Sequence, residues 1–154
     1  MPERMYDRAF VAAPLERCFE VAADVRGYPS WAREIRRVDL LEQDPQGLVR
    51  VARFVAGAMG FSVSIELHYD MSDAPTTFSW RGMPTNRIRR YEGRYDFAPA
   101  RRDGVSGTDV TYELLVDFSV PLPQLVQRRA ESMMVRRALQ SVRQVAESSS
   151  GAGG

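Results

Sequence analysis

The sequence predicts one α+β domain in which a curved antiparallel sheet of seven strands wraps around a long C-terminal helix. Three observations predict this fold. Apolar residues with helical spacing follow a short first strand. From Ile35 to Pro121, apolar and polar residues alternate with a period of two. A second pattern with helical spacing follows Pro121 and Pro123. A chain of 154 residues has the size of one domain, so we expect a single hydrophobic core.

The N-terminal segment predicts one strand and two short helices. Residues 6–12 are typical of a strand, and Pro14 suits the first turn of a helix because that turn needs no N–H at this position. Gly27 ends this helix, and Tyr28-Pro29-Ser30-Trp31 begins the next. One stripe of the first helix should be buried: Leu15, Cys18, Phe19, Ala22 and Val25.

Six further strands follow, separated by turn-forming segments at residues 44–47, 57–60, 73–75, 82–86 and 101–107. Three of these strands alternate clearly between apolar and polar residues, so one face of the sheet is expected to be apolar and the other wet. The apolar positions are Phe61, Val63, Ile65, Leu67, Tyr69 and Met71; Tyr91, Gly93, Tyr95 and Phe97; and Val110, Tyr112, Leu114, Val116 and Phe118.

The C-terminal segment predicts a helix that ends near Glu147 and covers the sheet. Its apolar stripe is expected to contain Leu122, Leu125, Val126, Ala130, Met133, Met134, Ala138, Val142 and Val145. The remaining residues, 148–154, are Ser, Gly and Ala, which bury too little surface to offset the entropy of ordering them. We expect a domain over residues 1–147 and a disordered tail over residues 148–154.

Composition excludes several classes of function. The formal net charge is +1, so no long-range field would attract nucleic acid. All 21 basic residues are arginine, which is typical of GC-rich genomes such as those of actinobacteria. With Cys18 and His68 as the sole cysteine and histidine, we expect neither an internal disulfide nor a metal site.

Motifs for phosphate-loop, serine-hydrolase and zinc chemistry are missing from the sequence, so we expect no cofactor. Residues 1–7 are charged and lack the apolar core of a signal peptide, and no run approaches the ~20 apolar residues of a membrane span. These features predict a soluble, cytoplasmic protein, and any contact that it makes with a membrane should be transient. We expect it to be a monomer or a homodimer.

Five segments resemble the START-like (SRPBCC) superfamily, in its branch of polyketide cyclases, dehydrases and lipid-transport proteins that includes coenzyme Q-binding-like members. They are Ala13-Pro14-Leu15, Asp24-Val25-Arg26-Gly27-Tyr28-Pro29-Ser30-Trp31, Tyr91-Glu92-Gly93-Arg94-Tyr95, Gly107-Thr108-Asp109-Val110-Thr111-Tyr112-Glu113-Leu114 and Pro121-Leu122-Pro123. The resemblance spans residues 6–147 and implies a helix-grip (START-like) fold. It also implies an internal cavity for a small hydrophobic molecule such as a lipid, an isoprenoid quinone or a polyketide.

Residues of the apolar sheet face and of the closing helix are the candidate ligand-binding residues. Tyrosine phenols could bond a ligand carbonyl, Trp80 could be a wall and Trp31 a gate, and methionines adapt to varied apolar shapes. For each of these residues, a plain core role is the alternative. The full set is Trp31, Phe61, Ile65, Tyr69, Phe78, Trp80, Tyr91, Tyr95, Tyr112, Leu114, Met133 and Met134.

Three other residues have competing interpretations. His68 occupies a strand position whose side chain points to the solvent-facing side of the sheet, so a surface residue is favoured over a general acid or base. Cys18 is favoured as a core residue over a nucleophile, and Arg53 either anchors an acidic head group or points outward. Binding or transport of a hydrophobic ligand is the first hypothesis. An aromatase/cyclase or dehydratase acting on a poly-β-ketone in the same cavity is the alternative, and a protein-interaction module is the third.

Overall fold

The computed structural model describes residues 4–58, 61–119 and 123–152, without the side chains of Ala58, Phe61 and residues 149–152. The elements in chain order are β1 (Met5–Val11), α1 (Leu15–Ala23), the 3₁₀ turn η1 (Val25–Gly27), α2 (Tyr28–Trp31), β2 (Ile35–Gln43), β3 (Val49–Ala58), β4 (Phe61–Asp70), β5 (Thr77–Gly82), β6 (Ile88–Arg102), β7 (Val105–Phe118) and α3 (Gln124–Ala152). This order confirms the one predicted from the sequence.

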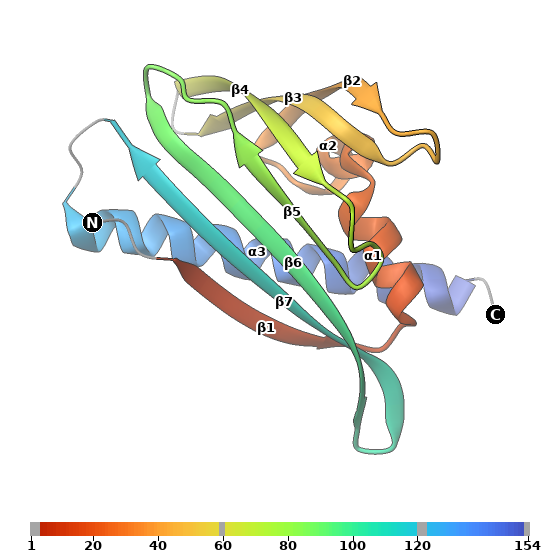
Figure 1. The fold of residues 1–154 in the computed structure, drawn as a ribbon. Coiled ribbons are helices and arrows are strands. Elements are labelled where there is room, and N and C mark those ends of the chain that lie inside the picture. The colour runs from red at the N-terminus through yellow and green to blue at the C-terminus, as the bar shows by residue number, and fades with distance from the viewer. Residues whose placement is uncertain (1–3, 59–60, 120–122, 153–154) are drawn as a thin grey trace.

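All seven strands form one antiparallel sheet in the order β1-β7-β6-β5-β4-β3-β2. The sheet curves, and α3 runs across its concave side, where it packs mainly against β1, β7 and α1 (Figure 1). Strands β2 to β5 bend away from the helix, with α1 and α2 beside them (Figure 1). This is the helix-grip arrangement, so the predicted fold class is confirmed.

A tight turn lets β6 and β7 run longer than the sequence indicated. The expected break at residues 101–107 is reduced to Asp103 and Gly104, which have φ of 50° and 78°, and the ladder extends to the pair Arg102 and Val105. An Asp-Gly pair with both φ values positive is the favoured two-residue hairpin turn, because its twist matches that of the strands.

The face that helix α3 presents to the sheet agrees only in part with the predicted one: Val142 is buried, and Ala138 and Val145 pack against the core. The predicted stripe is wrong for Met133 and Met134, whose side chains are 48% and 37% exposed, and for the exposed Leu125 and Val126. The stripe residue Leu122 lies outside the described residues. The buried positions are Glu131, Val135, Leu139, Val142 and Ala146. These follow one another every three or four residues, which places residue 133 on the opposite side of the helix.

The helix α3 continues through Ala152, beyond the end predicted near Glu147, whereas the disorder of residues 148–154 stays a prediction. Each added residue of an existing helix gains one backbone hydrogen bond, so extension is easier than initiation. In addition, the Ser148 hydroxyl donates to the Gln144 carbonyl oxygen at 2.7 Å, one turn back along the helix.

The motif Gly107-Thr108 joins β7 to the chain that leads into α1. A Cβ on Gly107 would lie 2.2 Å from the carbonyl oxygen of Val11, so β1 approaches β7 closely at this point. Thr108 is fully buried, and its hydroxyl donates to the Ala13 carbonyl oxygen at 2.9 Å. The start of α1 is therefore held to the sheet by a buried hydrogen bond.

Replacing Thr108 by Val is expected to lower the free energy of unfolding by about 1–2 kcal/mol. Valine keeps the shape of threonine but leaves the buried Ala13 carbonyl without its side-chain donor. Urea denaturation measures the change, and Thr111→Val, on the same strand but less buried, is the control. Equal stability of the Thr108→Val variant and the wild type would show that this bond contributes nothing.

Candidate ligand-binding site

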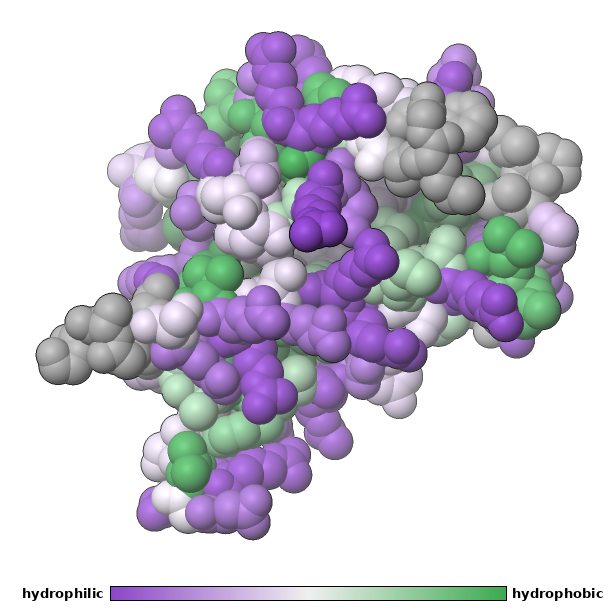
Figure 2. Space-filling model, turned by 180° about the vertical axis from the view of Figure 1, so that it is seen from behind, coloured by the Kyte–Doolittle hydropathy of each residue, from purple (hydrophilic) through white to green (hydrophobic). Residues whose placement is uncertain are grey.

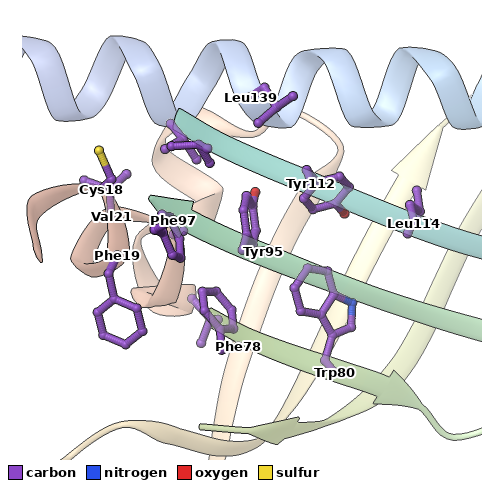
Figure 3. Packing of buried hydrophobic residues seen from close by; sticks show 14 of the residues in the cluster. Cys18, Phe19, Val21, Phe78, Trp80, Tyr95, Phe97, Tyr112, Leu114 and Leu139 are labelled. Atoms are coloured by element: carbon purple, nitrogen blue, oxygen red, sulfur yellow. The ribbon is translucent and has the colours of Figure 1, made fainter. Parts of the chain in front are cut away.

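A cluster of aromatic rings covers the concave face of the sheet beneath α3. Trp80 on β5, Tyr95 on β6 and Tyr112 on β7 come from three adjacent strands and point to the same side (Figure 3). The ring centroid of Trp80 lies 5.7 Å from that of each tyrosine, and those of Tyr95 and Tyr112 lie 4.6 Å apart. Tyr69 on β4 and Phe78 on β5 extend the cluster, each with its centroid 5.8 Å from that of Trp80.

Glycine on β6 makes room for the indole of Trp80. Gly93 is the register partner of Trp80, and a Cβ there would lie 2.1 Å from the Cζ2 atom of the indole. The indole therefore lies across the backbone of β6, held between the rings on both sides. Its Nε1 atom is buried and has no hydrogen-bond partner in the described part of the chain.

Five tyrosines are enclosed by protein. Desolvation by burial raises the pKa of Tyr28 and Tyr91, and raises the pKa of Tyr69, Tyr95 and Tyr112 well above the usual value. For Tyr91, a hydrogen bond with Tyr112 opposes this rise in pKa. The phenols are thus held in the protonated form at neutral pH, in which they can donate hydrogen bonds.

Tyr28, Tyr69 and Tyr91 nevertheless keep part of their surface accessible, whereas Tyr95 and Tyr112 are buried. All three side chains pack against the hydrophobic core and lie at its edge. The surface is hollowed beside the N-terminal half of α3, seen from behind (Figure 2). The concave face thus carries a continuous aromatic surface that is partly accessible at Tyr69 and Tyr91.

Near α2, an ion pair connects α3 to the segment after α2, and aromatic contacts connect α2 to β3. Arg137 on α3 donates to the Glu34 carboxylate, which follows α2, at 2.7 Å. The ring of Trp31 is tilted by 56° against that of Tyr28, with centroids 4.7 Å apart, and the ring of Tyr28 lies 5.9 Å from that of Phe54 on β3. Trp31 is half-buried, apart from the central cluster.

The family model for polyketide cyclases, dehydrases and lipid transport matches residues 3–147. The chain belongs to this polyketide cyclase/dehydrase and lipid-transport family. Among curated proteins, none matches the sequence.

Solved structures share the fold of this family member. A START superfamily protein from Mycobacterium smegmatis superposes with a TM-score of 0.83 at 18% identity, covering 94% of this chain and 97% of that one. TTHA0849 from Thermus thermophilus gives 0.77 at 20% identity, with 96% and 99% covered. The Zhui aromatase/cyclase from Streptomyces sp. R1128 gives 0.75 at 19% identity, with 96% and 94% covered. At these identities, the likeness shows the fold alone.

Most of the predicted site residues of this family member do lie together. Eight of them share the concave face: Ile65, Tyr69, Phe78, Trp80, Tyr91, Tyr95, Tyr112 and Leu114. Trp31 lies beside this face on α2, and the side chain of Phe61 lies outside the described residues. Met133 and Met134 are exposed and do not face the sheet, so their predicted place opposite the aromatic cluster is wrong.

Two polar residues on the inner face of α3 were missed by sequence reasoning. Glu131 is 3% exposed, and Gln127 donates both to the Glu131 carboxylate and to the Val116 carbonyl oxygen, each at 3.1 Å. The signal was the helical phase of Val135, Leu139 and Val142, which places residue 131 on the same inner face. The family member therefore carries a buried carboxylate beside its sheet.

His68, Arg53 and Cys18, the other candidates, lie away from the concave aromatic face. His68 is exposed and contacts Glu66 with a nitrogen–oxygen distance of 2.9 Å, and Arg53 points outward to the same carboxylate at 3.9 Å. Cys18 is buried in the core, where desolvation raises its pKa. The described residues hold no cluster of three or more ligands suited to a metal ion. No helix in the described ranges is both long and apolar enough to cross a bilayer.

A small polar depression on the outer side of β4 to β6 is a weaker candidate. Its lining is almost entirely polar: Asp70, Ser72, Asp73, Thr77, Phe78, Ser79 and Arg94. Two of its three charged residues are already engaged, since Arg94 pairs with Asp96 at 3.0 Å and the Asp70 carboxylate accepts from Ser72 at 2.6 Å. The concave aromatic face is therefore the stronger candidate site.

Proposed function

We propose that this protein binds and carries a small hydrophobic ligand, such as a lipid, an isoprenoid quinone or a polyketide, between the concave face of its sheet and α3. The observation that carries the proposal is the continuous set of aromatic rings on the concave face, of which Tyr69 and Tyr91 stay partly accessible. A ligand seated against these rings gains about 25 cal/mol for each Å² of apolar surface removed from water.

The interior supports binding more than catalysis. A cyclase needs a group that removes a proton from its substrate, and the enclosed phenols are held protonated, so they donate hydrogen bonds instead. His68 lies on the outer face, and the carboxylate of Glu131 already accepts a hydrogen bond from Gln127. The free thiol of Cys18 is consistent with the reducing environment of the cytoplasm, where we place this carrier.

Native mass spectrometry of the freshly purified protein, followed by solvent extraction, tests the proposal. We expect one hydrophobic molecule per chain, or binding of the neutral probe N-phenyl-1-naphthylamine to protein that is empty. A matched pair of variants locates the site. Val63→Trp places a large ring on the concave face of β4 and should abolish binding with little loss of stability. Ser64→Trp places the same ring on the outer face and should bind as the wild type does.

A wild-type protein that neither carries a molecule nor binds the probe would refute the carrier function. Equal binding by the two tryptophan variants would place the ligand elsewhere on the protein. If Val63→Trp is strongly destabilised instead, the concave side is filled by packed side chains and has no room for a ligand.

A further inference from the structure

The indole N–H of Trp80 is the one feature of the aromatic cluster that packing does not explain. Trp80 is 7% exposed, and its Nε1 atom is buried without a hydrogen-bond partner in the described residues. A buried donor without an acceptor lowers stability, and native proteins leave few of them. A ligand oxygen that reaches this N–H would supply the acceptor that the described residues do not.

The indole cannot turn to find such an acceptor within the protein. It lies on Gly93, where even a methyl group would clash, and the rings of Tyr69, Tyr95 and Tyr112 surround it. In the close view, the nitrogen edge of Trp80 points away from Phe78 and toward the part of the sheet that carries Leu114 (Figure 3). The N–H is therefore held in a constant direction above the concave face.

The groups around this donor set the charge of the ligand. Tyr91 and Tyr112 form a hydrogen bond with each other, and the phenols are neutral. Arg90 and Arg94 of β6 lie on the outer face, where Arg90 pairs with Glu92 and Arg94 pairs with Asp96. A carboxylate ligand would lose its hydration here without gaining a cation, whereas a neutral carbonyl oxygen needs only one donor.

We propose that Trp80 Nε1 donates a hydrogen bond to the carbonyl oxygen of a neutral aromatic ligand, an aryl ketone or a quinone, seated on the concave face. This inference rests on the carrier function proposed above and narrows its ligands to one chemical class. The flanking rings favour a planar ligand, because aromatic rings stack offset or edge to face on one another. Trp80 then sets both the orientation of the ligand and the preference for a carbonyl.

Three probes of nearly equal size test this: 2-acetylnaphthalene, which has the carbonyl, 2-ethylnaphthalene, which lacks it, and 2-naphthoate, which is anionic. With two tryptophans in the chain, a ¹H–¹⁵N spectrum contains two indole signals, assigned with Trp31→Phe. We expect the ketone to shift the Trp80 indole proton downfield and the hydrocarbon to leave its position nearly unchanged. The ketone should bind about fivefold more weakly to Trp80→Phe than to the wild type, with naphthoate weakest on both.

If Trp80→Phe does not fold, benzothienylalanine at position 80 of the Trp31→Phe variant replaces the N–H by sulfur and keeps the ring shape. Two results together would overturn the inference and leave the carrier function intact. The ratio of the ketone affinity to the hydrocarbon affinity would be the same with and without the N–H, and the ketone would not shift the Trp80 signal. Preference for naphthoate would overturn the assigned ligand class. Failure of all three probes, and of N-phenyl-1-naphthylamine, would remove both proposals.

Discussion

Raising the pH above 10 is expected to unfold this protein in one cooperative step. Five of its six tyrosines have a pKa raised by burial, so they stay protonated in the folded state at a pH where they ionise in the unfolded chain. Stability is therefore complete below pH 10 and falls as the pH rises beyond it. Each tyrosine lowers the free energy of unfolding by about 1.4 kcal/mol per pH unit as long as the pH lies below its folded-state pKa, so the five together lower it by at most about 7 kcal/mol per unit.

Typical domains are stable by about 5–15 kcal/mol, so the midpoint should lie roughly one to two units above pH 10. The chain has no lysine, and arginine stays charged in this range, so tyrosine ionisation dominates, with a smaller contribution from the buried thiol of Cys18. Tyrosinate absorbance and far-UV circular dichroism should change together, with Tyr6→Phe used to remove the exposed tyrosine from the signal. If the tyrosinate absorbance instead rises gradually with pH while the circular dichroism stays unchanged, the phenols are hydrated in the folded protein.

Replacing Gly93 by Ala is expected to destabilise the protein by about 3 kcal/mol and to abolish ligand binding. The added methyl group would lie 2.1 Å from Cζ2 and 2.3 Å from Cε2 of Trp80, closer than carbon atoms can approach. The indole cannot move aside easily, because Tyr95 and Tyr112 pack against it. Urea denaturation and probe titration measure the two effects.

The double variant Gly93→Ala/Trp80→Phe is the matched control, since phenylalanine lacks the outer ring of the indole that the methyl group would strike. Its stability should exceed the value obtained by adding the two single effects, with a coupling of about 1–2 kcal/mol. Additive effects would mean that the glycine is needed for its backbone and not for the room that it leaves to Trp80.

The period-two pattern of the strands is enough to predict which of their side chains share the concave face, and so most of the candidate site. Strand parity separates Tyr69, Tyr95 and Tyr112 from Glu66, Asp96 and Glu113 without ambiguity, because neighbouring side chains point to opposite faces. The helix is harder to predict. Its exposed Met133 and buried Glu131 reverse what hydrophobicity alone indicates, since the phase of a helix is set by what it packs against.

The sequence by itself determined the order of the elements, the apolar face of the sheet and the resemblance to the family, because these depend on local spacing and on turn residues. Only the tertiary structure decided that Gly93 lies under Trp80, that the indole N–H is left without a partner among the described residues and that Arg137 reaches Glu34. These contacts join residues from different strands and helices. Their distances follow from the register and curvature of the whole sheet, which no local pattern encodes.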